Sequence, residues 1–372
     1  MKKIVFFGNL KINSGTILTL SLATRRFRHT PIRDKRPKAS ISYKLILIFL
    51  CIIFAVNLNA QTTYYSLSTG DWGTPPNDKW STASCGGAGA GDDYPGKSST
   101  TDNAVICSGT TITIDINNLT ITDLTVESGA VLNLSNANNF TVLGNLVVNG
   151  TVMGSRDLYL SGGGTTIDGT GYIDINDPSS KDLVINGNVS VLSSANLTIT
   201  EDINIASGVT VTNNGTITVN TDILGADATS TWTNAANSTL KIGNALLNST
   251  AGTLNASASG NTIEYISSTD QDIMNPSSST YYNLTISGGG IKYLKANTII
   301  DGNLTINSGT FDCDVTNNYT IDVKGSWNNS GTFNEQQGTV TFNGTSDQSF
   351  SNSSNETFYN LTTNKSSGTL IL

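Results

Sequence analysis

The chain has 372 residues and a formal net charge of −8, with 20 Lys and Arg against 28 Asp and Glu. Residues 1–60 hold 11 of the basic residues, one acidic residue and the single histidine, which leaves 9 basic and 27 acidic residues and a net charge near −18. A chain this acidic lacks the basic face that binds phosphate backbones, so nucleic acid is excluded as a partner. Without histidine, residues 61–372 cannot form His-assisted nucleophiles or His metal sites.

Residues 1–60 are predicted to be a signal or targeting segment. An apolar run at 45–56 ends before Asn-Leu-Asn-Ala at 57–60, which resembles the h-region and small-residue cleavage site of a secretory signal. Its 12 residues are too few to span a membrane, which takes about 20. We therefore expect an exported protein with no membrane span after signal removal. The long basic stretch 1–44 is better explained by a start codon assigned too early than by a special targeting function.

Residues 61–108 form a distinct opening module that is rich in aromatic residues, glycine and proline. We expect an irregular N-terminal cap that covers the open sheet edge of the first coil. The alternative is an aromatic platform for sugars, but buried aromatics are the commoner use. The aromatic residues are Tyr64, Tyr65, Trp72, Trp80 and Tyr94.

The cysteines after residue 60 suit an oxidising compartment. Cys85 and Cys107 flank a Gly-rich segment, and in an exported protein they are predicted to form a disulfide. Cys313 is left over. We expect it to be a buried thiol, with pairing to a cysteine outside this sequence as the alternative.

From residue 109 to residue 372, short segments of alternating apolar and polar residues are separated by Asn, Ser and Gly. Ser-Gly-Thr-Phe at 308–311 returns at 330–333, and similar elements that begin at positions 128, 149 and 169 recur at nearly the same spacing. Alternation indicates half-buried strands, and a period of about 20 residues is typical of a coiled β-solenoid. The predicted fold class is all-β, a parallel β-solenoid that we expect to be a right-handed β-helix.

A longer repeat lies over the short one. Residues 262–295 align without a gap on 339–372, so that Asp270-Gln271 falls on Asp347-Gln348. The chain thus stops inside a repeat. We expect it to be the front part of a longer protein.

The opening module, with Trp-Ser at 80–81, Cys-Gly-Gly at 85–87, Pro-Gly at 95–96 and Asn-Ala-Val-Ile at 103–106, precedes repeats containing Tyr-Asn-Leu-Thr and Gly-Asn-Leu-Thr-Ile-Asn-Ser-Gly-Thr-Phe-Asp. This pattern resembles the large secreted β-solenoid proteins of Bacteroidota, which are adhesin-like surface proteins that often end in a sorting domain for type IX secretion. The resemblance covers nearly all of residues 61–372. It implies the architecture more strongly than any activity, because its motifs are turn and strand residues. The sequence contains no sorting domain, so either it is truncated or the export route differs.

One segment matches the phosphate-loop consensus GxxxxGK[ST], at residues 91–98. Its context argues against phosphate binding. No apolar strand precedes it, no amphipathic helix follows it, and Asp92 and Asp93 would repel phosphate. Pro95 also removes a backbone N–H that such a loop would use.

Two Asp pairs are candidates for carboxylate catalysis of the kind found in sugar-cleaving enzymes: Asp312 with Asp314, and Asp174 with Asp177. Paired Asp residues at strand-to-corner positions are more often turn formers or weak Ca²⁺ ligands. Arg156 is the single arginine after residue 60, so a bidentate clamp for acidic sugars has one possible member. We therefore predict no enzyme, no catalytic or metal-binding residue, and no cofactor beyond weak Ca²⁺ binding.

Paired threonines suggest a further alternative, a flat hydroxyl array of the kind used by ice-binding proteins. Threonine is also simply a good solvent-facing strand residue, which is the favoured interpretation. The pairs are Thr111/Thr113, Thr120/Thr122, Thr210/Thr212 and Thr216/Thr218.

The sequence as a whole predicts a secreted or outer-surface protein with a structural, adhesin-like function. Its expected partners are surface glycans or other cells, contacted by weak interactions repeated along the coils. The alternative is a β-helix protein that binds or degrades polysaccharide.

Overall fold

The computed structural model describes residues 61–73, 78–134, 139–176, 182–247, 252–353 and 356–372. The chain separates into two units, Met1–Leu58 and Asn59–Leu372, and the predicted targeting segment lies outside the described residues. The described part contains 39 strands and one short 3-10 helix, η1 (Ser277–Ser279), and no α-helix. Within it, no helix is long and apolar enough to cross a membrane.

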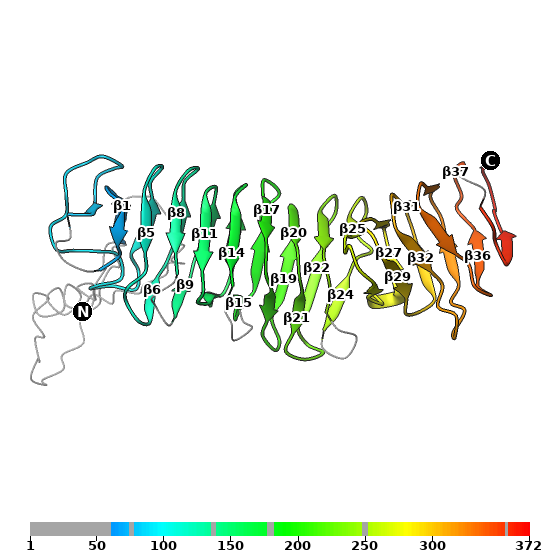
Figure 1. Cartoon of the computed structure of the whole chain (residues 1–372), viewed down its shortest axis with the longest axis horizontal. Helices are drawn as coiled ribbons and strands as arrows, with labels where there is room; N and C mark the ends of the chain where they lie inside the picture. Colours follow the sequence, from blue (N-terminus) through cyan, green and yellow to red (C-terminus); the bar gives the residue numbers. More distant parts are fainter. Residues whose placement is uncertain (1–60, 74–77, 135–138, 177–181, 248–251, 354–355) are drawn as a thin grey trace, which may run out of the picture. The chain divides into compact units, whose positions relative to one another are not determined.

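Successive strands form a coil, and each coil stacks on the one before it (Figure 1). Thus β5 (Thr111–Thr113) pairs in parallel with β8 (Val131–Asn133), three strands later, and β8 pairs with β11 (Thr151–Gly154). The predicted all-β parallel solenoid is confirmed.

A 14-stranded sheet, called here the long sheet, joins the coils along one face. In order its strands are β2 (Gly70–Asp71), β5, β8, β11, β14 (Tyr172–Ile175), β17 (Asn196–Ile199), β20 (Thr216–Val219), β23 (Thr239–Ile242), β25 (Thr262–Tyr265), β28 (Asn283–Ile286), β31 (Leu304–Ile306), β34 (Trp327–Asn329), β37 (Gln348–Asn352) and β39 (Leu370–Ile371).

Two further sheets complete the coils in the first part of the solenoid. The six-stranded sheet follows the long sheet in each coil and contains β6 (Leu119–Ile121), β9 (Phe140–Val142), β12 (Leu158–Leu160), β15 (Leu183–Ile185), β18 (Ile203–Ile205) and β21 (Ile223–Gly225). The ten-stranded sheet contains β3 (Trp80–Ser81), β1 (Thr63–Ser66), β4 (Asn103–Ile106), β7 (Leu124–Val126), β10 (Leu146–Val148), β13 (Thr165–Asp168), β16 (Val189–Val191), β19 (Thr210–Asn213), β22 (Thr231–Asn234) and β24 (Thr253–Asn255).

Two other sheets take these places in the later coils. The four-stranded sheet contains β26 (Gln271–Ile273), β29 (Ile291–Leu294), β32 (Thr310–Asp312) and β35 (Thr332–Asn334). The five-stranded sheet contains β27 (Thr280–Tyr281), β30 (Thr298–Ile300), β33 (Ile321–Val323), β36 (Thr339–Phe342) and β38 (Asn360–Thr363).

The core is a set of columns of like residues, one from each coil. Ile112 pairs with Leu132, Leu132 with Val152, and Val152 with Ile173, and all four are buried. Alternation along each strand puts these residues inside and threonine or asparagine outside. Burying one such aliphatic side chain contributes about 1.5–3 kcal/mol. Stacking therefore provides the burial that one coil cannot provide alone.

The N-terminal end is closed by aromatic side chains. Trp72 and Trp80 are fully buried with ring centroids 4.7 Å apart, and Trp72 also packs on Phe140 at 5.5 Å. The Trp72 indole N–H donates to the Pro95 carbonyl. Strand β3 pairs antiparallel with β1 and so ends the parallel ladder. Trp72 and Trp80 are therefore core residues, not a sugar platform. Pairing between coils already begins within residues 61–108. Strands β1 and β4 belong to the ten-stranded sheet, and β2 belongs to the long sheet.

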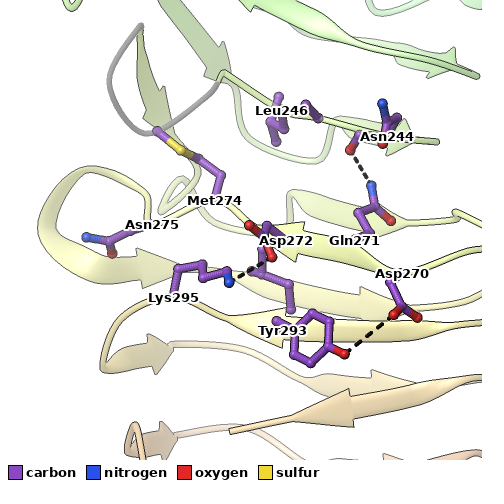
Figure 2. Close-up of a pocket in the computed structure, with 11 residues that line it drawn as sticks. Asn244, Leu246, Asp270, Gln271, Asp272, Met274, Asn275, Tyr293 and Lys295 are labelled. Atoms are coloured by element: carbon purple, nitrogen blue, oxygen red, sulfur yellow. Dashed lines mark hydrogen bonds and ion pairs between the residues drawn. The ribbon is translucent and has the colours of Figure 1, made fainter. Parts of the chain in front are cut away.

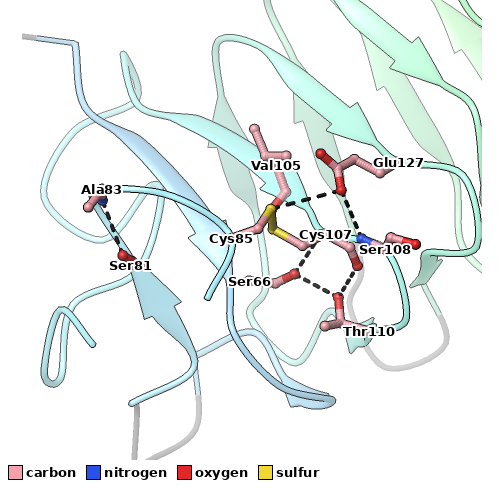
Figure 3. The surroundings of a disulfide bond; sticks show 9 residues. All are labelled: Ser66, Ser81, Ala83, Cys85, Val105, Cys107, Ser108, Thr110 and Glu127. Atoms are coloured by element: carbon pink, nitrogen blue, oxygen red, sulfur yellow. Dashed lines mark hydrogen bonds between the residues drawn. A yellow bond between two sulfur atoms is a disulfide. The ribbon is translucent and has the colours of Figure 1, made fainter. Parts of the chain in front are cut away.

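The predicted disulfide joins Cys85 to Cys107, with their Cα atoms 5.9 Å apart (Figure 3). It ties the cap to the end of β4. A buried hydrogen-bond network surrounds Cys107: its N–H donates to the Ser66 hydroxyl, its carbonyl accepts from the Thr110 hydroxyl, and these two hydroxyls lie 2.7 Å apart. Because Thr110 gives its proton to the carbonyl, Ser66 must donate to Thr110.

Replacing both cysteines by serine is expected to loosen the cap locally. Disulfides of this kind typically contribute about 2–4 kcal/mol, so amide hydrogen exchange in β1 and β4 should accelerate at least about 30-fold. Exchange in β28 and β31 is the internal control, because distant coils of a solenoid do not share contacts. Equal exchange in β1 and β4 with and without the disulfide would contradict a stapling role.

Candidate functional site

Two faces of the solenoid flank the long sheet, and we call them the side faces. Between β21 and β27, the six- and ten-stranded sheets on these faces end, and the four- and five-stranded sheets begin. The six-stranded sheet ends at β21, and the next coil adds an isolated bridge from Leu246 to Ile223. The four-stranded sheet begins one coil later at β26, which pairs with β29 on its far side. Among the described residues no ladder joins β26 to the coil before it. On the other side face a single bridge, Ala256 to Tyr281, connects the two sheets.

Two buried tyrosines provide hydrogen bonds at this break. The Met274 N–H, directly after β26, donates to the Tyr265 hydroxyl at 3.0 Å, and the Tyr281 hydroxyl donates to the Met274 carbonyl. The hydroxyl oxygens lie 2.9 Å apart, and since Tyr281 has already used its proton, Tyr265 donates to Tyr281. Burial raises the pKa of Tyr265, and that of Tyr281 well above its usual value, so both keep these protons at neutral pH. The core thereby satisfies backbone groups at the end of β26.

Gln271 joins β26 to the preceding coil. Its side chain is buried, and its amide N–H₂ donates to the carbonyls of Ile242 at 3.1 Å and Asn244 at 2.5 Å. Its amide oxygen accepts from the Ser267 N–H at 3.3 Å. One side chain thus makes two hydrogen bonds across the break and a third to the backbone of its own coil.

The repeated Asp-Gln element has the same structural use in its second copy. Gln348 is fully buried, donates to the carbonyls of Val323 and Gly325, and accepts from the Gly344 N–H. The Asp residues act alike as well, because each carboxylate accepts a backbone N–H from the following coil. These bonds are Ile291 N–H to Asp270 and Thr369 N–H to Asp347, both 2.8 Å. The longer repeat of the sequence therefore marks a repeated corner that joins coils.

A groove of about 380 Å³ lies at the break (Figure 2). The side chains of Asp270, Asp272, Tyr293 and Lys295 lie along one side of it, from β26 and β29 and their flanking residues. Leu246, from the preceding coil, lies on the other side. The groove thus occupies the place where direct pairing of β26 with the preceding coil is absent.

The polar groups of the groove contact one another but remain open to solvent. The Lys295 ammonium lies 2.9 Å from Asp272, with 39% and 67% of the two side chains exposed, and 5.4 Å from the ring centre of Tyr293. The Tyr293 hydroxyl donates to Asp270 at 3.4 Å. Partial burial is the main cause that raises the pKa of Tyr293, and the nearby charge of Asp270 adds to it. The hydrogen bond to Asp272 raises the pKa of Lys295. At neutral pH Tyr293 therefore keeps its proton and Lys295 carries its positive charge.

Lys292, beside the groove, was not anticipated from the sequence. Its side chain is fully buried, and its ammonium donates to the carbonyls of Ser267 at 2.7 Å, Thr269 at 3.4 Å and Gly289 at 2.5 Å. Burial lowers its pKa, and the nearby charge of Asp270 acts in the opposite direction. The signal in the sequence was strand alternation, because Lys292 lies on the same side of β29 as buried Leu294.

The Asp pairs proposed for catalysis are used differently. Asp312 is buried and accepts hydrogen bonds from the Asp314 N–H and from the side chains of Asn334 and Gln336. Asp314 has a φ of 65°, and its carboxylate accepts the N–H groups of the two turn residues that follow Val315. Both members of the first pair are therefore turn formers.

The remaining candidates from the sequence, Asp174, Asp177 and Arg156, are far in sequence from the residues that line the groove. Asp174 accepts a hydrogen bond from the Thr200 hydroxyl at 2.6 Å, and Asp177 lies outside the described residues. Arg156 is exposed in a bend between β11 and β12. Asp174 and Arg156, the two described members of this set, lie in coils distant from that of Asp312.

The phosphate-loop match forms an irregular segment of the cap. The Gly96 N–H donates to the Asp102 carboxylate at 3.1 Å, and the Lys97 ammonium donates to the Asp92 carbonyl of the same loop. The next described element is strand β4, not a helix. The segment therefore lacks the strand, helix and free N–H groups of a phosphate site.

The cysteines offer little reactive chemistry. Cys85, Cys107 and Glu127 lie close enough to hold a metal ion, but both sulfurs are in the disulfide, and Glu127 accepts the Ser108 N–H at 2.9 Å. Cys313 is free and buried, as expected, and burial raises the pKa of its thiol to about 12. It is therefore a protonated core residue at neutral pH.

One outward threonine column is interrupted by charged residues. On the long sheet Thr218 pairs with Lys241, which pairs with Glu264 in a 3.1 Å ion pair, before Thr285 continues the column. Two other columns continue over three threonines each: Thr210, Thr231 and Thr253, and Thr216, Thr239 and Thr262.

No protein-family model, no curated protein and no solved structure matches this chain.

Replacing Tyr265 by phenylalanine should destabilise the break. The Met274 N–H loses its acceptor and Tyr281 loses a donor, and a buried polar group without a partner costs about 1–3 kcal/mol. Denaturant unfolding measures this change, with Tyr172→Phe as the control, because Tyr172 is 56% exposed. If the two variants unfolded at the same denaturant concentration, the tyrosine network would contribute nothing.

Proposed function

We propose that this chain is an exported, adhesin-like structural solenoid of the outer cell surface. The observation that carries this proposal is the long sheet, which joins coils from the cap to the last described strand. Fourteen strands spaced about 4.8 Å apart extend about 60 Å. A ladder of that length suits a scaffold that displays surfaces at a distance from its attachment.

The use of the polar residues supports a structural function. Asp312, Asp314, Gln271 and Gln348 are engaged in turns or in bonds between coils. The Cys85–Cys107 disulfide supports export, because such bonds persist in oxidising compartments. The strongly acidic composition supports a surface that keeps copies apart by repulsion. We assign no catalytic role to these residues.

Polysaccharide binding is a second candidate function, and the groove at the sheet break favours it. An aromatic ring, two carboxylates and an ammonium group lie there with their polar atoms open to solvent. A solenoid that displays such a groove on a surface could attach to glycans of other cells.

Protease treatment of intact native cells tests the proposed location. An antibody against residues 302–333 should detect the protein on untreated cells, and external protease should remove that signal while a cytoplasmic protein of the same cells survives. Alkylation without reduction should leave Cys85 and Cys107 unlabelled. Protection from the protease until the cells are lysed, or labelling of both cysteines, would contradict the proposal.

A further inference from the structure

We infer that the groove between Leu246 and Tyr293 is a binding site for a neutral saccharide chain. This inference deepens the second candidate function, from which it takes the class of ligand. It goes further in naming the site, the residues and the charge of the sugar.

The groove is built into the fold and needs no rearrangement to form. Gln271 fixes its base to the preceding coil, and the Tyr265–Tyr281 pair fixes Met274 at its rim. A site held by buried hydrogen bonds loses little conformational entropy on binding. This separates it from a loose surface cleft.

Tyr293 provides the apolar contact for a sugar ring. In the ladder it lies between Asp272 and Asp312, on the outward face of β29. The C–H face of a pyranose can pack on such a ring while its hydroxyls point to polar neighbours. Lys295 lies over the ring at 5.4 Å, but an exposed cation–π contact contributes only about 0.5–1 kcal/mol. A sugar can therefore displace it.

The surrounding groups match sugar hydroxyls. Asp272 and Lys295 are exposed enough to exchange water for a ligand, and Asp270 uses one oxygen for the Ile291 N–H and directs the other toward the Tyr293 hydroxyl. Carboxylates can accept hydrogen bonds from sugar hydroxyls, and the ammonium can donate hydrogen bonds to hydroxyl or ring oxygens. Such charge-assisted hydrogen bonds are stronger than those between neutral groups.

Charge selects the class of saccharide. Among the residues that line the groove, the carboxylates of Asp270 and Asp272 outnumber the ammonium of Lys295, while the buried Lys292 lies beside them, and the chain as a whole is strongly acidic. Uronic acids and sulfated sugars would be repelled, whereas neutral sugars would bind without a charge penalty.

A second hollow, over the six-stranded sheet, fits this ligand less well. It is lined by Tyr159 with asparagine, serine and threonine side chains and has a volume of about 270 Å³. Its tyrosine hydroxyl donates to Asp157 at 2.7 Å, and the described residues that line it include no carboxylate or ammonium group. It also lies over paired strands, β9 and β12, where the ladder is continuous.

The test is a binding titration of the purified full chain, followed by saturation-transfer NMR. The neutral probes are cellohexaose, laminarihexaose and N-acetylchitohexaose, and hexagalacturonate is the acidic probe of equal length. We expect at least one neutral probe to bind with a dissociation constant on the order of 1 mM or tighter, and the acidic probe to bind at least about tenfold more weakly.

Two variants locate the site. Tyr293→Ala should weaken binding of the neutral probe about tenfold through loss of the ring contact, and Asp272→Asn should weaken it through loss of a charged acceptor. Tyr172→Ala, which removes an exposed tyrosine outside the groove, should bind within twofold of the wild type. Asp272→Asn keeps the test decisive if Tyr293→Ala fails to fold.

Three results would overturn the inference: no binding of any neutral probe at 5 mM, roughly five times the weakest affinity expected; equal binding by Asp272→Asn and Tyr172→Ala; or tighter binding of hexagalacturonate. None of them bears on the surface location, which the protease experiment measures without any ligand. A surface-exposed protein that binds no sugar would leave the structural proposal in place.

Discussion

The constraint on which this molecule depends is the pairing of each coil's backbone with the next. A strand of three or four residues buries too little to be stable alone, and its N–H and C=O groups need partners on both sides. Parallel ladders along the long sheet meet both needs at once, since the same register that pairs the backbone also stacks Ile112, Leu132 and Val152 inside. The corners between strands then need only return the chain to the register that pairs it with the preceding coil.

Most of the architecture could be predicted from the sequence, because both of its periods are local. Alternation predicts the strands, and a period of about 20 residues predicts the coil. The return of Asp270-Gln271 was visible as a repeat, but its meaning was not, because the bonds of Gln271 go to Ile242 and Asn244 in the preceding coil. Lys292 could have been identified by strict use of alternation with Leu294. The groove could not, since it depends on the place where, among the described residues, no ladder joins β26 to the preceding coil.

Polar residues in this protein are therefore poor guides to chemistry when taken by type alone. Asp312 and Asp314 resemble a catalytic pair in the sequence, yet each carboxylate accepts backbone N–H groups of its own turn. Asp270 and Asp347 do the same between coils, at equal distances. Asp272 differs from these four because its ion pair is with an exposed lysine, as is that of Asp301 with Lys324. A solenoid must use most of its carboxylates at corners, so a carboxylate left with an exposed partner is the informative one.

The break shows how a ladder can stop inside a stacked fold without leaving its backbone unpaired. Gln271 replaces the missing pairing on one side of β26, and the two tyrosine hydroxyls satisfy both polar groups of Met274. Gln271 reaches the preceding coil, whereas Tyr265 and Tyr281 belong to the same coil as Met274. The groove lies at this same break. The structural repair and the space for a ligand are thus two consequences of one omission, and in a fold built from repeated pairing the place where pairing stops is where a specific surface can arise.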